Sequence, residues 1–234
     1  MAKAPYRPPV PAPAFIRLLA GFAEGPLPTT SPDIADRLSH WVDWNRAVAL
    51  SRALDGRLPS VPEGTPPFDA AEQAECERVR AVLADAIVAA PDPGRGPVAG
   101  TDDYAAHRQR CITLQRAMQA STGRLRGRLR DMLCQASPDL ARLAEVDAVM
   151  EQTLSPREQS LLATVPALLG SHFDRLRAAA GPVQAGCDTD EATPATASAS
   201  WLARFHQDMQ DVLLAELDVR FQPIEGLLAA LRSR

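Results

Sequence analysis

Aromatic residues make up only 5% of this 234-residue chain, and β-branched residues are also sparse. Because both kinds of side chain are enriched in strands, their scarcity argues against a large β-sheet. Alanine, leucine, arginine and glutamate are abundant instead, a bias that favours helix. The apolar fraction of 46% is in the globular range, and the length allows one large domain or two small ones. The composition therefore predicts a globular helical protein.

An excess of positive charge is also missing. The formal net charge is −4 and the isoelectric point is about 5.6, so the protein as a whole does not attract nucleic acid or an anionic membrane electrostatically. Lys3 is the only lysine, and arginine supplies the other positive charges. We attribute this bias mainly to genome composition, so it says little about function.

No segment has the pattern of a signal peptide or a membrane span. The N-terminal sequence MAKAPYRPPVPAPAFIRLLAGF is interrupted by prolines and by Arg17, whereas a spanning helix needs roughly 20 apolar residues. The cysteines lack CxxC spacing, which argues against a disulfide framework; they are Cys76, Cys111, Cys134 and Cys187. Together these absences predict a cytoplasmic protein.

Apolar residues at spacings of three and four predict an all-α bundle of about six or seven helices with long central helices. Residues 1–13 are rich in proline and alanine and are expected to be disordered. Residues 14–180 form the predicted bundle domain, 181–199 a low-complexity linker, and 200–234 a C-terminal helical segment. The predicted helices span 14–24, 33–55, 69–90, 101–136, 138–153, 155–180 and 201–232.

Proline positions predict where the helices begin and bend. Ser137-Pro138 and Ser155-Pro156 each have the pattern of an N-cap followed by the first helical residue. Pro166 is expected to kink or restart the helix over 155–180, and Pro223 to bend the last helix. Thr101 or Asp102 is the expected cap of the helix over 101–136.

Two tryptophans, Trp41 and Trp44, fall on the apolar face of the helix predicted over 33–55, together with Ile34, Leu38 and Val48. Because their spacing matches a buried helical face, we interpret the pair as core rather than as a ligand platform.

The helix predicted over 101–136 is rich in arginine, which within Tyr104–Ala136 is opposed only by Asp131. Its arginines spread around most of the circumference outside a predicted buried stripe, and the next helix is acidic through Asp139, Glu145, Asp147 and Glu151. The predicted stripe consists of Cys111, Leu114, Met118, Leu125, Leu129, Met132 and Leu133. We favour the hypothesis that the two helices pair or that the charges are simply solvated. The alternative is contact with nucleic acid or another anionic partner through Arg124, Arg126, Arg128 and Arg130.

No catalytic, metal or cofactor site is predicted. His107 and Cys111 have a spacing that can place two ligands on one metal, but structural zinc requires four ligands and no second pair lies nearby in sequence. The segment GRLRGRLR lacks the lysine of a phosphate-binding loop. An enzyme remains a third hypothesis, which would need a pocket where His107, His172 or His206 meet carboxylates.

The C-terminal helix is the other candidate contact surface, because it is long, broadly apolar and preceded by the predicted linker. It can complete the bundle, which we favour, or dock on a protein partner or a second copy of the chain. The candidate partner-binding residues are Trp201, Phe205, Met209, Leu213, Phe221 and Ile224.

Several blocks resemble an uncharacterised family of bacterial, mainly proteobacterial, proteins that carries only a domain-of-unknown-function label. They are the central segment 103–178, which includes LLATVPALL (161–169), the segment DRLSHWVDWNRAVALSRALDG (36–56), and the segment WLARFHQDMQDVLLAELDVRFQPIEGLLAAL (201–231). The resemblance covers nearly the whole chain and implies no activity. It does imply a gene neighbourhood with proton-channel motor-type and OmpA-like envelope proteins, and hence a cytoplasmic accessory to an envelope complex.

The leading functional hypothesis is a non-enzymatic adaptor or scaffold that acts through helix–helix contacts with a protein partner or a second copy. Any membrane contact is then indirect, through that partner. A nucleic-acid-associated regulator using the Arg-rich helix 104–136 is the alternative.

Overall fold

A computed structural model describes residues 13–22, 41–56, 70–89, 103–180 and 194–233. Within these ranges the protein is all-α, with no strand, which confirms the predicted fold class. No helix in these ranges contains the long apolar stretch that a membrane span needs. The helices are α1 (Ala14–Phe22), α3 (Trp44–Asp55), α4 (Ala70–Val88), α5 (Tyr104–Ala136), α6 (Pro138–Leu162), α7 (Val165–Ala179) and α8 (Pro194–Arg232).

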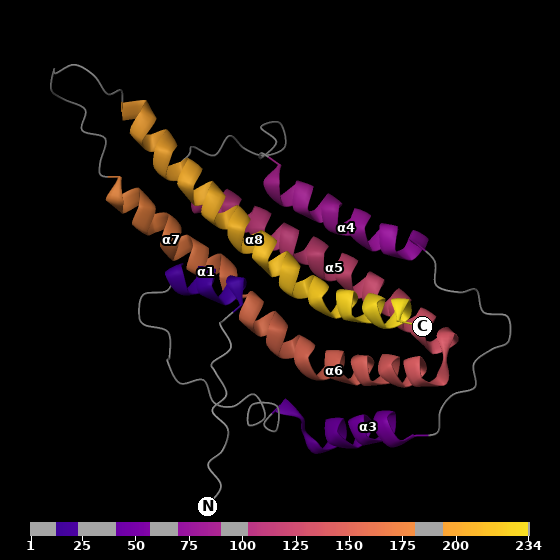
Figure 1. Ribbon diagram of the computed structural model, residues 1–234. Coiled ribbons are helices and arrows are strands. Elements are labelled where there is room, and N and C mark those ends of the chain that lie inside the picture. Colours follow the sequence, from indigo (N-terminus) through magenta and orange to yellow (C-terminus); the bar gives the residue numbers. More distant parts are fainter. Residues whose placement is uncertain (1–12, 23–40, 57–69, 90–102, 181–193, 234) are drawn as a thin grey trace, which may run out of the picture.

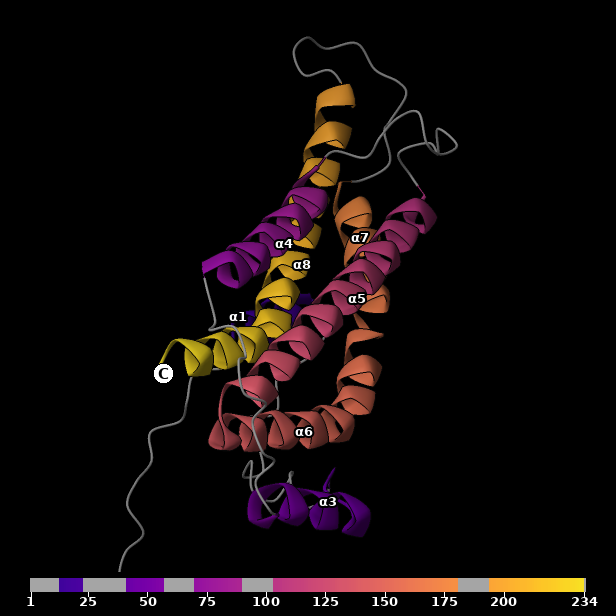
Figure 2. The same cartoon turned by 90° about the vertical axis from the view of Figure 1, so that its right-hand side faces the viewer.

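The long helix α8 has neighbours along most of its length (Figure 1). It packs against α5, α4, α7 and α1, while α6 packs against α5. α3 lies at the end of the molecule and packs mainly against α6, as both views show (Figure 2). The core therefore forms around α8 and α5, and α3 is a peripheral element.

The buried stripe of α5 matches the sequence prediction. Its fully or almost fully buried residues include Cys111, Leu114, Met118, Leu125, Leu129 and Leu133, and Met132 is partly buried. The N-cap is Asp103, whose carboxylate accepts a hydrogen bond from the Ala105 amide at 2.9 Å. The predicted caps, Thr101 and Asp102, lie outside the described residues.

The Ser137-Pro138 prediction is confirmed, and the Ser155-Pro156 prediction is wrong. Ser137 Oγ accepts a hydrogen bond from the Leu140 amide at 3.2 Å and begins α6. α6 then continues through Pro156 to Leu162, and Figure 1 shows that it bends along its length. An internal proline costs about 3 kcal/mol because it removes one helical hydrogen bond. Buried residues on both sides, Thr153 and Leu162, offset this cost by packing the helix in place.

The described chain breaks between α6 and α7 at Ala163 and Thr164, beside Pro166 and not at Ser155. Thr164 precedes α7, and Pro166 occupies the first turn of that helix, where a missing amide donor costs little. The prediction that Pro166 restarts the helix is therefore confirmed.

The N-terminal side of α3 also differs from the prediction. Val42 and Asp43 are not helical, and the Asp43 carboxylate caps α3 by accepting from the Arg46 amide at 2.8 Å. The predicted continuous helix over 33–55 is therefore wrong at this point, and Ile34 and Leu38 lie outside the described residues. The cap interrupts the helical periodicity, so Trp41 and Trp44 no longer share a face. Trp41 is half-buried, whereas Trp44 is 81% exposed, so its assignment to the core is wrong.

α8 begins at Pro194, before the predicted start at Trp201, so the last part of the predicted linker 181–199 is helical. The earlier part, 181–193, lies outside the described residues, as do residues 1–12 of the segment expected to be disordered. Pro223 lies inside α8, which is bent (Figure 2), as predicted. The helix buries an apolar face along its length: Phe205, Met209, Val212, Leu213, Leu217, Phe221, Ile224, Leu227, Leu228 and Leu231.

Close contact between α5 and α7 depends on Gly170. A Cβ atom there would lie 2.9 Å from Cε1 of Tyr104, closer than side chains normally approach, so a larger residue would have to displace the Tyr104 ring. The Tyr104 hydroxyl in turn donates a hydrogen bond to the Pro166 carbonyl. Tyr104 thereby joins the start of α5 to the start of α7.

Side chains of neighbouring helices cap the C-terminal ends of α4 and α1. Arg110 on α5 donates to the carbonyls of Ile87 and Ala89, and Gln210 on α8 donates to that of Val88. Arg175 on α7 donates to the Phe22 carbonyl at 2.7 Å. Carbonyls at helix ends lack intrahelical partners, so these bonds tie α4 and α1 to the central helices.

Truncation of the core side of α8 should be far more costly than truncation of an exposed leucine. We expect Leu213→Ala, at a fully buried position, to lower the free energy of unfolding by about 2–5 kcal/mol because it leaves a cavity. Leu161→Ala, at a position 67% exposed, should change it by less than about 0.5 kcal/mol. Urea unfolding followed by circular dichroism measures both, and equal losses would contradict the assignment of α8 to the core.

Candidate functional site

Two of the four candidate arginines face carboxylates inside the molecule. Arg126 forms a two-bond pair with Asp147 on α6, with Nε–Oδ2 at 2.8 Å and Nη2–Oδ1 at 2.7 Å. Arg130 pairs with Glu151 at 2.6 Å and lies 3.6 Å from Asp147. Both arginines are partly buried, so the basic helix and its acidic neighbour form an interhelical charge network, as the favoured hypothesis expected.

The other two candidates lie on more exposed parts of α5. Arg128 contacts Glu72 on α4 at 2.6 Å. Arg124 is exposed, with a 3.4 Å contact to the hydroxyl of Ser121. Only Arg124 among the four has no carboxylate partner within the described part of the chain. The four arginines therefore do not form one surface of free positive charge.

The predicted partner-binding residues of α8 lie in the core. Phe205, Met209, Leu213, Phe221 and Ile224 are almost completely buried by the other helices. Trp201 is half-buried and contacts Phe173 edge-to-face, with ring centroids 5.1 Å apart. In this fold α8 completes the bundle, and the five buried side chains face its core rather than solvent.

His107 and His206 meet between α5 and α8, in an aromatic cluster that sequence reasoning did not predict. Their ring centroids lie 4.9 Å apart, and His107 also lies 5.2 Å from the ring of Phe205. Burial lowers the pKa of His107 to about 4, with further effects of His206 and Arg110. Burial, followed by Arg110, also lowers the pKa of His206, whose Nε2 is buried with no hydrogen-bond partner among the described residues. Both imidazoles are therefore neutral at pH 7.

The remaining chemically active side chains include a histidine paired with an aspartate and a buried thiol. His172 contacts Asp208 at 2.7 Å and stacks near Phe22. Cys111 is fully buried, and burial followed by the charge of Glu216 raises the pKa of its thiol to about 12, so the thiolate is scarce. Within the described ranges, no three His, Cys, Asp or Glu residues are placed to hold a metal ion.

A buried polar network crosses the core where α5, α6 and α8 meet. The Glu216 carboxylate is completely buried and accepts two hydrogen bonds from Arg220, at 2.9 and 2.8 Å, and one from Gln115 at 2.9 Å. Arg220 also lies 3.7 Å from Glu158 on α6. Sequence reasoning missed this network, although a Glu and an Arg four residues apart within an apolar stretch were a visible signal.

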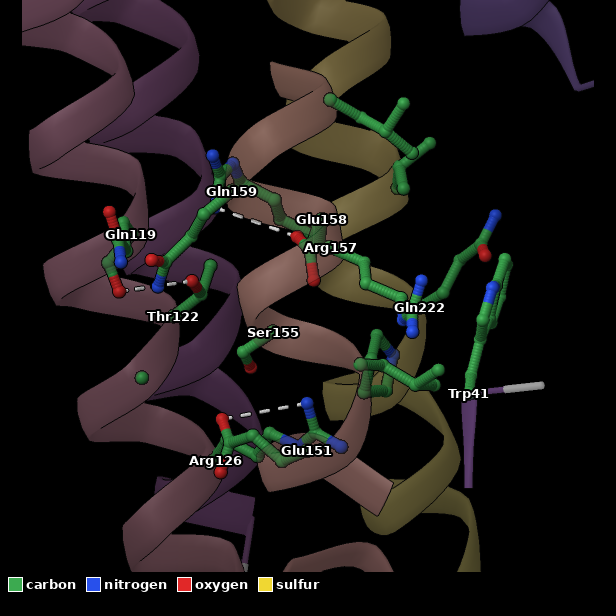
Figure 3. A pocket seen from close by; sticks show the side chains of 16 residues that line it. Trp41, Gln119, Thr122, Arg126, Glu151, Ser155, Arg157, Glu158, Gln159 and Gln222 are labelled. Carbon is green, nitrogen blue, oxygen red and sulfur yellow. Dashed lines mark hydrogen bonds and ion pairs between the residues drawn. The ribbon is translucent and has the colours of Figure 1, made fainter. Parts of the chain in front are cut away.

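The network borders clefts that surround the second half of α6. The largest of three such clefts, of about 560 Å³, lies between α5, α6 and α8 and is lined by Thr122, Arg126, Glu151, Glu158 and Arg220, among others (Figure 3). A cleft of about 400 Å³ adjoins it and shares Gln119, Gln159 and Arg220. A third, of about 500 Å³, shares Trp41, Arg157 and Leu161.

The cleft walls combine polar and charged groups with an aromatic side chain. The Arg157 guanidinium lies 5.2 Å from the ring centroid of Trp41, a cation–π contact that closes one side of the largest cleft. On the opposite side, Figure 3 shows Arg126 of α5 paired with Glu151 of α6. This arrangement suits binding of a polar group.

Removal of one member of the buried pair should be more damaging than removal of both. We expect Arg220→Met to lower the free energy of unfolding by roughly 3–5 kcal/mol, because it leaves a buried carboxylate without its countercharge. In the double variant Glu216→Met/Arg220→Met, most of that loss should be recovered. Urea unfolding tests this, and a double variant as unstable as Arg220→Met would show that the pair does not act as a unit.

The lowered pKa of His107 makes stability depend on pH. The unfolded chain binds a proton with a pKa near 6.5, but the folded protein does so only near 4. The free energy of unfolding should therefore fall between about pH 7 and pH 4, by roughly 1–3 kcal/mol from this group. Urea unfolding across this range should show a shallower decline for His107→Gln than for the wild type, and parallel curves would rule out the effect.

Comparison with known proteins places the chain in a family. It matches the family described as "Protein of unknown function (DUF3348)" over residues 1–233. No curated protein and no solved structure matches it. The resemblance found in the sequence is thereby confirmed, and the chain belongs to the DUF3348 family of proteins of unknown function.

Proposed function

We propose that this protein is a non-enzymatic cytoplasmic adaptor that binds a protein partner through helix–helix contacts, as an accessory to a cell-envelope complex. The observation that carries the proposal is the outer face of α3, which leaves a tryptophan and a leucine in solvent. Trp44 is 81% exposed and Leu54 is 49% exposed.

The outer face of α3 consists of Trp44, Ala47, Ser51 and Leu54, all of which are exposed. At about 100° per residue these positions fall within an arc of about 80°. The opposite side of the helix carries the contacts with α6, including the hydrogen bond from Arg46 to Gln152 at 2.8 Å and the buried Ala53. α3 is therefore held by one face and presents a second, largely apolar face outward.

A face of this kind suits a helical partner. Apolar residues at spacings of three and seven match the pattern with which one helix packs on another or enters a groove. Tryptophan is also the residue type most enriched among those that dominate binding energy at interfaces. An exposed Trp44 on a peripheral helix is thus better explained by binding than by folding.

The cytoplasmic location is supported by the thiols. Cys76, Cys111 and Cys134 are free in the described structure, and free cysteines are typical of reducing compartments. The association with an envelope complex is supported by the gene neighbourhood that the family resemblance implies.

The nucleic-acid alternative remains a prediction that the geometry favours less. Its four arginines include three that contact Asp147, Glu151 or Glu72, and these carboxylates would have to be displaced by phosphates. Binding of a partner to the outer face of α3 does not require the displacement of any such carboxylate.

Site-specific photo-crosslinking in the native cell tests the α3 face. A benzophenone amino acid that replaces Trp44 or Ser51 should yield a discrete crosslinked protein. The same probe in place of Val82, which is 59% exposed on α4, is the matched control and should not yield that product. No product from α3, or the same product from position 82, would overturn the proposal.

The crosslinked partner then permits a quantitative test. Trp44→Ala should weaken its binding by about tenfold or more, as truncation of an interface hot spot does. Because Trp44 is exposed, the free energy of unfolding should change by less than about 0.5 kcal/mol. Val82→Ala should leave both quantities unchanged.

A further inference from the structure

The cleft of about 400 Å³ differs from its neighbours in charge. It lies where α5 meets the junction of α6 and α7, and three arginines line it: Arg108, Arg116 and Arg220. Its other lining residues are Ile112, Gln115, Gln119, Gln159, Leu162, Ala163, Pro166 and Ala167, so no carboxylate is among them. The larger cleft, by contrast, contains Glu151 and Glu158.

Arg108 and Arg116 are exposed, and no carboxylate of the described residues forms an ion pair with either of them. In this they differ from Arg126, Arg128 and Arg130 of the same helix, which all have carboxylate partners. Their guanidinium donors are therefore available to a ligand in the cleft, and each can form a two-bond contact with an oxyanion.

Arg220 forms part of the wall of this cleft, but its charge is paired inside the protein. Its side chain is 8% exposed, two of its nitrogens bond to the buried Glu216, and Nη1 lies 3.7 Å from Glu158. Glu216 therefore balances its charge. The positive charge of the cleft that no carboxylate balances is therefore that of Arg108 and Arg116. The buried network of Glu216, Arg220 and Gln115 holds the adjoining wall of the cleft in place.

Uncharged groups around the cleft also suit an anion. Gln119 on α5 and Gln159 on α6 stand at the border with the larger cleft (Figure 3) and can supply amide donors.

We propose that this cleft is a binding site for a small molecule that carries two linked phosphate groups. Arg108 and Arg116 are eight residues apart, or about 12 Å along the helix axis, with Ile112 between them. Two long side chains at this separation can converge from both ends on a diphosphate. A volume of about 400 Å³ is also within the range of small-molecule sites. The proposal is independent of the partner surface on α3.

Isothermal titration of the full-length protein with inorganic pyrophosphate tests this site. We expect saturable one-to-one binding that weakens at least tenfold in Arg108→Gln/Arg116→Gln. The matched control is Arg124→Gln, which removes an exposed arginine of the same helix outside the cleft and should leave the affinity unchanged. Circular dichroism and thermal unfolding should show that all variants keep the wild-type fold.

Further ligands separate this site from general charge effects. Inorganic phosphate should bind more weakly than pyrophosphate, and sodium chloride at equal ionic strength should not substitute for either. The proposal is overturned if pyrophosphate does not bind, or if Arg124→Gln weakens binding as much as the double variant. A single-stranded oligonucleotide gives a third test. The proposal is also overturned if the oligonucleotide binds more tightly than pyrophosphate and loses affinity both in Arg124→Gln and in Arg108→Gln/Arg116→Gln, since that result indicates a nucleic-acid surface along α5.

Discussion

Burial of the apolar face of α8 is the constraint on which the rest of the structure depends. α1, α4, α5 and α7 all pack against this helix, and its inward side chains from Phe205 to Leu231 make up much of the core. A long apolar stripe can slide or rotate against its neighbours at little cost, but the bonds from Arg220 and Gln115 to the buried Glu216 are directional. Such a network is costly unless every member is satisfied, so it favours one register of α8 against α5.

The same arrangement divides the arginines of α5 into two groups. Arg126, Arg128 and Arg130 face carboxylates of α6 and α4, and therefore serve the packing of the bundle. Arg108 and Arg116 face the junction of α6 and α7, where the break at Ala163 and Thr164 leaves a cleft without carboxylates. The position of that break thus decides which positive charges remain available for binding. The apolar face of α3 is a separate surface at the other end of α6.

Much of the fold could be predicted because its causes are local. The buried stripe of α5, the Ser137 cap, the restart at Pro166 and the bend at Pro223 follow from periodicity and from the missing amide of proline. The errors arise where a tertiary effect outweighs a local one. Packing on both sides of Pro156 keeps α6 continuous, and the Asp43 cap turns Trp44 away from the core. The candidate residues of α8 were identified as an apolar face, but which surface that face would meet depended on all the other helices.

The sequence by itself determined that this is an all-helical protein of the DUF3348 family, which helices are amphipathic, and where α1, α4 and α6 begin. These properties follow from composition, from periods of three and four residues, and from capping side chains. Only the tertiary structure decided that α8 lies inside the bundle, that Glu216 and Arg220 form its buried polar centre, and that Arg108, Arg116 and Trp44 remain exposed. The physical reason is that burial and charge pairing depend on residues far apart in the chain, whose proximity arises only when the helices pack.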